Sequence, residues 1–181
     1  MNLLGNGLHA LLQNPHLLDK LRADPDALPN AVEELLRFDS PVDITAWRYA
    51  TEAVQVGDVT ISSGDPVLIS LCAANRDPAA FAGPDRVDVN RQPTKHLAFG
   101  FGTHYCLGAP LARLQGEVAF AAVLPRFHDM GFSTDPEELR WRSGLLRRGL
   151  EHLPVSFRPT STDGSCPVVA AERLPTSGVY E

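Results

Sequence analysis

The sequence predicts a mainly α fold with a small antiparallel β component, and two observations carry this prediction. Leucines recur at helical spacing near the N-terminus, and a second apolar stretch of helical length follows Ala109. Between these stretches, β-branched residues alternate in short runs that turn residues separate, which is typical of antiparallel strands. The expected order is therefore helices first, then short strands, then one long helix.

Three helices are expected at the N-terminal end. The leucines of the first helix lie on one face, and Pro15 ends this helix and starts the next, because proline is tolerated in a first helical turn. A third helix is expected to begin at Pro29 and to run through AVEELLRF until Ser40 and Pro41 stop it.

Short strands are expected over residues 44–49, 54–56, 59–61 and 67–71, with Gly57 and Asp58 as a two-residue hairpin turn. Residues 75–98 are rich in Pro, Asn, Asp and Gly, which predicts a long irregular segment. Such a segment inside a compact domain is usually functional. A helix is then expected from Ala109 to Pro125, followed by short strands and turns.

The length and composition fit one globular domain over residues 1–158, followed by a tail over 159–181 whose Pro, Ser, Thr and Gly content predicts disorder. The chain carries 16 Lys and Arg against 22 Asp and Glu, a formal charge of −6, which argues against nucleic-acid binding. No apolar run reaches the roughly 18 residues of a membrane span. Three scattered cysteines favour a reducing, cytoplasmic location over a disulfide framework.

The stretch FGFGTHYCLG is the most informative part of the sequence. Gly100, Gly102 and Gly108 allow positive φ angles and let the backbone approach a bulky flat ligand closely. Cys106 comes just before a predicted helix, whose N-terminal dipole stabilises the thiolate that ligates metals. A buried thiol in a glycine-rich turn is the commoner fate of an isolated cysteine.

This stretch, with the APLAR that follows it, resembles the cysteine-ligand loop and next helix of the soluble bacterial cytochrome P450 haem-thiolate monooxygenases. The resemblance implies haem b, with the Cys106 Sγ atom as the axial ligand of the iron. It also implies that Phe99 packs beside the thiolate and that His104 hydrogen-bonds a haem propionate. Electrons would come from a redox partner.

The helix AVEELLRF is similar to the E-x-x-R helix of the same family. Glu34 and Arg37 lie three residues apart and can pair on one helix face, although such pairs are usually exposed and weak. The resemblance implies that the pair is buried and joined by a third arginine, expected to be Arg86. This cluster would serve folding and haem loading, because removal of one member strands the charge of the others.

The resemblance assigns further residues around the haem. Arg48 lies where the family carries an arginine to a haem propionate. Substrate-facing positions are expected in two turns, at Val42, Ile44, Leu145 and Leu146. The alternative is that these four are ordinary core and turn residues that contact no substrate. His96 and Lys95 are expected to face solvent, and a zinc site formed by His96, His104 and Cys106 lacks a fourth ligand.

The partners expected from the resemblance are a small organic substrate and a ferredoxin-type electron donor, which Lys95 and Arg113 could attract by charge. The order of elements matches only the C-terminal part of a family member, so a truncated P450 fold is expected. The distal acid and threonine that deliver protons to bound oxygen are absent, so no catalytic residue is assigned. The chain is therefore a monooxygenase fragment, an inactive haem-binding remnant, or a module without haem.

Overall fold

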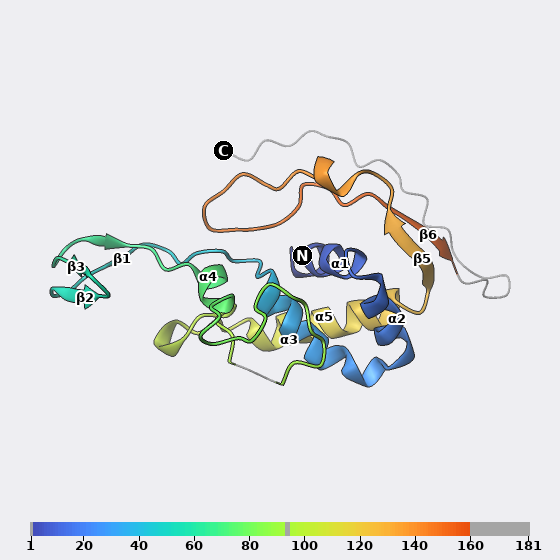
Figure 1. Cartoon of the computed structure of the whole chain (residues 1–181), viewed down its shortest axis with the longest axis horizontal. Coiled ribbons are helices and arrows are strands. Elements are labelled where there is room, and N and C mark those ends of the chain that lie inside the picture. The colour runs from blue at the N-terminus through green and yellow to red at the C-terminus, as the bar shows by residue number, and fades with distance from the viewer. Residues whose placement is uncertain (1, 93–94, 160–181) are drawn as a thin grey trace.

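In the computed structural model, which describes residues 2–92 and 95–159, the chain is mainly helical with three small antiparallel sheets (Figure 1). The expected fold class is thereby confirmed. The tail over 160–181, for which disorder is expected, lies outside the described residues.

The N-terminal helices form much as the proline positions predict. They are α1 (Asn2–Leu12), α2 (Pro15–Ala23), the short 3-10 helix η1 (Pro25–Ala27) and α3 (Leu28–Phe38). Proline occupies the first turn of α2 and of α3, where its missing N–H group costs no hydrogen bond. The long helix α5 (Ala109–Val123) likewise has a proline in its first turn.

The hydrophobic core lies where α1, α2, α3 and α5 meet. Leu11, Val32, Leu35 and Leu124 are almost fully buried there. Gly116 allows α5 to pack closely on α3, because a Cβ atom at this position would lie only 3.1 Å from Val32 Cγ1. The result is a tight contact between α5 and α3, the two helices that flank the functional site.

Two strands match the expected residues 54–56 and 59–61, whereas those expected over 44–49 and 67–71 are shorter than predicted. The strands of the described residues are β1 (Arg48–Tyr49), β2 (Val54–Val56), β3 (Val59–Ile61), β4 (Pro66–Val67), β5 (Phe127–Phe132) and β6 (Val155–Pro159). They pair antiparallel as β1–β4, β2–β3 and β5–β6, and Figure 1 shows the β1–β4 region and the β5–β6 pair at opposite ends of the molecule.

Two strand expectations need correction, whereas the hairpin is confirmed. Val56 pairs with Val59 across Gly57 and Asp58, and Gly57 has a φ of 57°. The strand expected over 67–71 ends at Val67, because Ser70 caps the helix α4 (Leu71–Asn75): its side chain accepts a hydrogen bond from the Ala73 N–H group. Over 44–49, only β1 forms a paired strand.

The described residues between α4 and the 3-10 helix η2 (Gly102–His104), which are 76–92 and 95–101, form the long irregular segment that the composition predicts. A further 3-10 turn, η3 (Pro136–Glu138), follows β5. In the described residues, no helix is long and apolar enough to cross a membrane.

Candidate haem-binding site

The segment 97–108, called the cysteine loop below, is a closed loop held by its own backbone. The Cys106 N–H group donates to the Phe99 carbonyl at 2.9 Å, and the Gly100 N–H group donates to the Leu97 carbonyl at 2.8 Å. Gly100 and Gly102 have φ angles of 76° and 69°, in the left-handed region that side chains disfavour. Both glycines are therefore needed for the shape of the loop.

Gly108 plays a different part from the one expected. Its φ is −82°, so it needs no positive φ, and it caps the start of α5, where its carbonyl accepts the Ala112 N–H group at 2.9 Å. A Cβ atom at Gly108 would lie 3.7 Å from the Cys106 Sγ atom. The absence of a side chain at Gly108 therefore leaves the space beside the sulfur open.

The Cys106 thiol is exposed and lies close to the N-terminus of α5. The Cys106 backbone carbonyl accepts a hydrogen bond from the Ala109 N–H group at 3.2 Å, and this bond joins the loop to the helix. Burial and the Asp43 carboxylate raise the pKa of the other described thiol, the half-buried Cys72, to about 12, so Cys72 stays protonated.

A cavity of about 1110 Å³ lies beside the cysteine loop, and Cys106 is one of its lining residues. Its walls are largely apolar and come from several parts of the chain, including Leu3 on α1, Leu36 on α3, Leu71 on α4, Ala98 in the loop and Val118 on α5. Arg48 on β1 and His104 in η2 supply polar groups at the same cavity.

These groups fit a haem. A thiol offers a ligand for iron, apolar walls suit a porphyrin, and the Arg48 guanidinium with the His104 imidazole offers donors for carboxylates. The cavity is as large as the upper end of ordinary ligand pockets, about 1,000 Å³. The open space beside the Cys106 Sγ atom leaves room for a close approach.

The four expected substrate-facing residues do not all reach this cavity. Val42 lines it, together with Thr45 and Ala46 from the same segment. Ile44, Leu145 and Leu146 are not among its lining residues. The two segments nevertheless meet, because the Asp43 N–H group donates to the Leu146 carbonyl at 3.1 Å.

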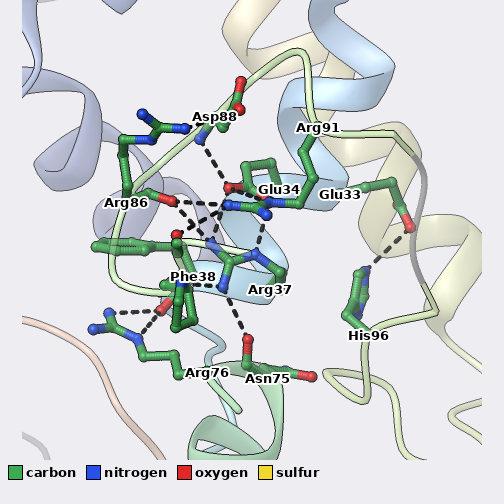
Figure 2. Close-up of polar contacts among 12 residues, drawn as sticks. Glu33, Glu34, Arg37, Phe38, Asn75, Arg76, Arg86, Asp88, Arg91 and His96 are labelled. Atoms are coloured by element: carbon green, nitrogen blue, oxygen red, sulfur yellow. Dashed lines mark hydrogen bonds and ion pairs between the residues drawn. The ribbon is translucent and has the colours of Figure 1, made fainter. Parts of the chain in front are cut away.

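A buried ion-pair cluster of Glu34, Arg37 and Arg91, called the Glu34 cluster, joins α3 to the irregular segment (Figure 2). The Arg37 side chain donates from Nε to Glu34 Oε2 at 2.8 Å and from Nη2 to Glu34 Oε1 at 2.9 Å. Arg37 also donates to the carbonyls of Asn75 and Pro84, at 2.9 and 2.8 Å. Only 2% of the Arg37 side chain is exposed.

The third arginine of this cluster is Arg91, so the expectation for Arg86 was wrong. Arg91 Nε lies 3.1 Å from Glu34 Oε2, whereas the Arg86 side chain is 75% exposed and reaches only Asp88, at 3.7 Å. Arg86 contributes its carbonyl, which accepts from Arg37 Nη2 at 3.1 Å. The Asp88 carboxylate accepts the Asn90 N–H group, which turns the chain so that Arg91 returns to α3.

A second cluster of Glu33, His96 and Arg113, called the Glu33 cluster, lies on another side of α3. Arg113 donates from Nε to Glu33 Oε1 at 2.6 Å and from Nη2 to Glu33 Oε2 at 3.0 Å. His96 Nε2 lies 3.2 Å from Glu33 Oε2, and only 4% of the His96 side chain is exposed. The expectation that His96 faces solvent was therefore wrong, whereas Lys95 is exposed.

Pairing changes the acidity of two members of this cluster. Burial alone would raise the pKa of Glu33, but the hydrogen bonds and charges of His96 and Arg113 outweigh burial and lower it from 4.5 to about 2. The hydrogen bond to Glu33 is also the main reason that the pKa of Arg113 is raised. Glu33 is therefore ionised, and its charge offsets that of Arg113.

Asn75 is a site residue to which the sequence analysis assigned no individual role. It is fully buried at the end of α4, and its Oδ1 atom accepts the Leu97 N–H group at 2.6 Å, while its carbonyl accepts from Arg37. The next residue, Arg76, donates to the Phe38 carbonyl at 2.8 and 3.0 Å. The motif NRDP at the end of a short helix could have indicated these contacts.

Within 2–92 and 95–159, no group of three or more His, Cys, Asp and Glu side chains is placed to hold a metal ion. The structure therefore gives no support to a zinc site at His96, His104 and Cys106.

Comparisons with known proteins agree on one family. The family model described as "Cytochrome P450" matches residues 4–147. The chain is 50% identical over 155 residues to "Cytochrome P450 107B1" of Saccharopolyspora erythraea, which covers 86% of this chain and 38% of the relative. It is 47% identical over 157 residues to "Polyketide biosynthesis cytochrome P450 PksS" of Bacillus subtilis, with 87% and 39% covered.

Among solved structures, the chain is similar to the tirandamycin C-bound P450 monooxygenase TamI. The TM-score is 0.85 at 48% sequence identity, over 87% of this chain and 39% of that one. The chain thus spans less than two-fifths of the length of the relatives that it matches.

Proposed function

Because the chain belongs to the cytochrome P450 family, we propose that it supplies the haem-thiolate side of a monooxygenase site. The observation that carries this proposal is the position of Cys106 on the large apolar cavity, in a loop that ends at the start of α5. The cofactor would be haem b with Cys106 as its axial ligand. When bound, the haem activates oxygen, and a thiolate ligand favours cleavage of the O–O bond.

The residues around the cavity have separate parts in this proposal. Cys106 binds the iron, and Phe99 shields the loop from one side through ring contacts with His96 and Tyr105. Arg48 and His104 hold the propionates by charge-assisted hydrogen bonds. The apolar walls, such as Leu36 and Leu71, exclude water from the bound group.

The reaction class that we propose is the insertion of one oxygen atom from O₂ into an organic substrate, with reduction of the other to water by two electrons and two protons. Val42, on the same cavity, is the best placed of the expected substrate contacts. One relative is named for polyketide biosynthesis, so an apolar polyketide-type compound is the first substrate class to test. The residues assigned here include no group that moves a proton to oxygen.

The proposed electron donor is a ferredoxin-type protein that docks on the outer side of the cysteine loop. Leu107 is 98% exposed there, and Lys95 is exposed nearby in sequence. Arg113 contributes less charge than expected, because Glu33 pairs with it. Electron transfer that is unaffected by salt and by Lys95→Glu would contradict docking through charge.

One observation favours the second candidate, a haem-binding protein without turnover. Leu114 and Val118 line the cavity, yet they are 57% and 60% exposed, so the described residues do not close it. An open cavity admits water to a bound haem, and water favours side reactions. The two candidates share haem binding and differ only in substrate oxidation.

The test is the reduced, carbon-monoxide difference spectrum of the full chain after addition of hemin. We expect a thiolate-type Soret band that Cys106→Ala abolishes and that Cys72→Ala, a change at a half-buried thiol off the cavity, leaves unchanged. Absence of this band in the unaltered chain would contradict haem-thiolate binding. If the band forms, substrate oxidation with an added ferredoxin and its reductase separates the enzyme from the inactive protein.

A further inference from the structure

Two neighbouring carboxylates on α3 serve different parts of the site. Successive residues of a helix point about 100° apart, so Glu33 and Glu34 face different segments. Figure 2 shows Glu34 among Arg37 and Arg91, and Glu33 directed toward His96. Glu34 thus secures the irregular segment, whereas Glu33 contacts residues on both sides of the cysteine loop.

Glu33 joins the two ends of this loop. His96 immediately precedes the loop and Arg113 lies on α5 beyond it, and one carboxylate contacts both. The Arg113 contact uses two parallel N–H···O bonds of 2.6 and 3.0 Å, a geometry that fixes orientation as well as distance. The two points at which the chain enters and leaves the loop are therefore fixed to α3.

Arg113 carries this constraint into the loop itself. Its Nη1 atom donates to the Tyr105 hydroxyl at 3.1 Å, and its guanidinium lies 4.6 Å from the centroid of the Phe99 ring. Tyr105 directly precedes Cys106, and the Phe99 carbonyl accepts the Cys106 N–H group. The Arg113 guanidinium thus contacts two neighbours of Cys106: Tyr105, which precedes it in the chain, and Phe99, which is hydrogen-bonded to it across the loop.

We propose that Glu33 and Arg113 are positioning residues for Cys106, which hold the cysteine loop in the geometry that presents the sulfur to iron. The proposal rests on the function proposed above and names residues to which that function gave no role. Neither residue lines the cavity, so both act through Tyr105, Phe99 and the loop backbone.

The test compares Glu33→Gln with Glu117→Gln in the hemin-loaded full chain. Glu33→Gln removes the negative charge and places an amide N–H₂ group where Arg113 donates its hydrogen bonds. Glu117 is the control because it is a carboxylate on α5 that makes no ion pair among the described residues. We expect Glu33→Gln to bind haem but to lose most of the thiolate-type band per bound haem. Glu117→Gln should match the unaltered chain.

Hydrogen exchange of the haem-free chain gives a second measurement. In Glu33→Gln, amides of residues 97–106 should exchange about tenfold faster, the ratio expected from loss of one charge-assisted hydrogen bond. Amides of α1 should be unchanged. This measurement separates the two proposals, because it tests the positioning role even if the unaltered chain gives no thiolate band.

Identical behaviour of the two glutamine variants in both measurements would overturn the proposal. If Glu33→Gln instead unfolds throughout, Arg113→Lys decides. Lysine can pair with Glu33 but cannot reach the Tyr105 hydroxyl at the same time or stack as a planar group. An intermediate thiolate band supports positioning by the guanidinium, and a band equal to that of the unaltered chain contradicts it.

Discussion

Glu34 and Arg37 pair through two parallel hydrogen bonds, at 2.8 and 2.9 Å, with both side chains almost fully buried. A buried ion pair is not by itself a strong source of stability, because both charges lose their hydration. Its importance here lies in what Arg37 holds: the carbonyl of Asn75 at the end of α4, and the carbonyls of Pro84 and Arg86 in the irregular segment. The pair therefore organises a segment that has no regular hydrogen bonding of its own.

Arg37→Ala should lower the free energy of unfolding by about 3–5 kcal/mol, because it leaves the Glu34 carboxylate and three carbonyls without this partner. Haem retention should be lost with it. Urea unfolding and hemin titration measure the two effects, and Arg140→Ala, at an exposed arginine, is the control. A variant that unfolds and loads haem like the unaltered chain would contradict this prediction.

Arg91→Ala and Arg86→Ala should differ. Arg91 is 12% exposed and contacts both Glu34 oxygens, so its loss should cost about 2–3 kcal/mol. Arg86 keeps its carbonyl when its exposed side chain is removed, so the cost should be below about 0.5 kcal/mol. Chemical unfolding of both variants measures the difference. A larger loss of stability in Arg86→Ala than in Arg91→Ala would indicate that Arg86, and not Arg91, is the third arginine of the cluster.

Gly100→Ala and Gly102→Ala should each cost about 1–2 kcal/mol and weaken haem binding, because alanine disfavours their positive φ angles. At Gly102 no atom lies within 4 Å of the added Cβ, so the cost there comes from the backbone alone. Gly5→Ala is the control: it lies inside α1 with nothing within 4 Å and should stabilise by about 0.5–1 kcal/mol. Hemin affinity equal to that of the unaltered chain at both loop positions would argue against the need for these angles.

Stability should depend on pH through Glu33. Folding lowers the pKa of this carboxyl from 4.5 to about 2, so its contribution is complete above pH 4.5 and is lost as the pH falls toward 2. With 32% of the side chain exposed, solvent screening reduces this contribution to about 1–2 kcal/mol. The difference in unfolding free energy between the unaltered chain and Glu33→Gln should therefore shrink across this range, and a constant difference would count against it.

Local sequence signals identified most of the elements. Prolines in the first turns of α2, α3 and α5 are compatible with helix starts, and Gly57 with Asp58 forms the expected hairpin turn. The strand expected over 67–71 was wrong beyond Val67, since the capping hydroxyl of Ser70 outweighed the apolar run that follows β4. β propensity reflects how well a side chain packs on a pleated, half-buried surface, so a local helix cap can override it.

The candidate site divides in the same way. Cys106, Gly100, Gly102 and the Glu34–Arg37 pair were singled out by the resemblance to a family motif, since a cysteine in a glycine-rich turn and an i,i+3 pair are common patterns when taken alone. The choice of Arg91 over Arg86, the burial of His96 and the link from Glu33 to Arg113 were decided by the tertiary structure. The physical reason is distance along the chain: Glu33 and Arg113 meet only because α3 packs against α5, and no local pattern encodes which of several polar side chains a buried charge will select.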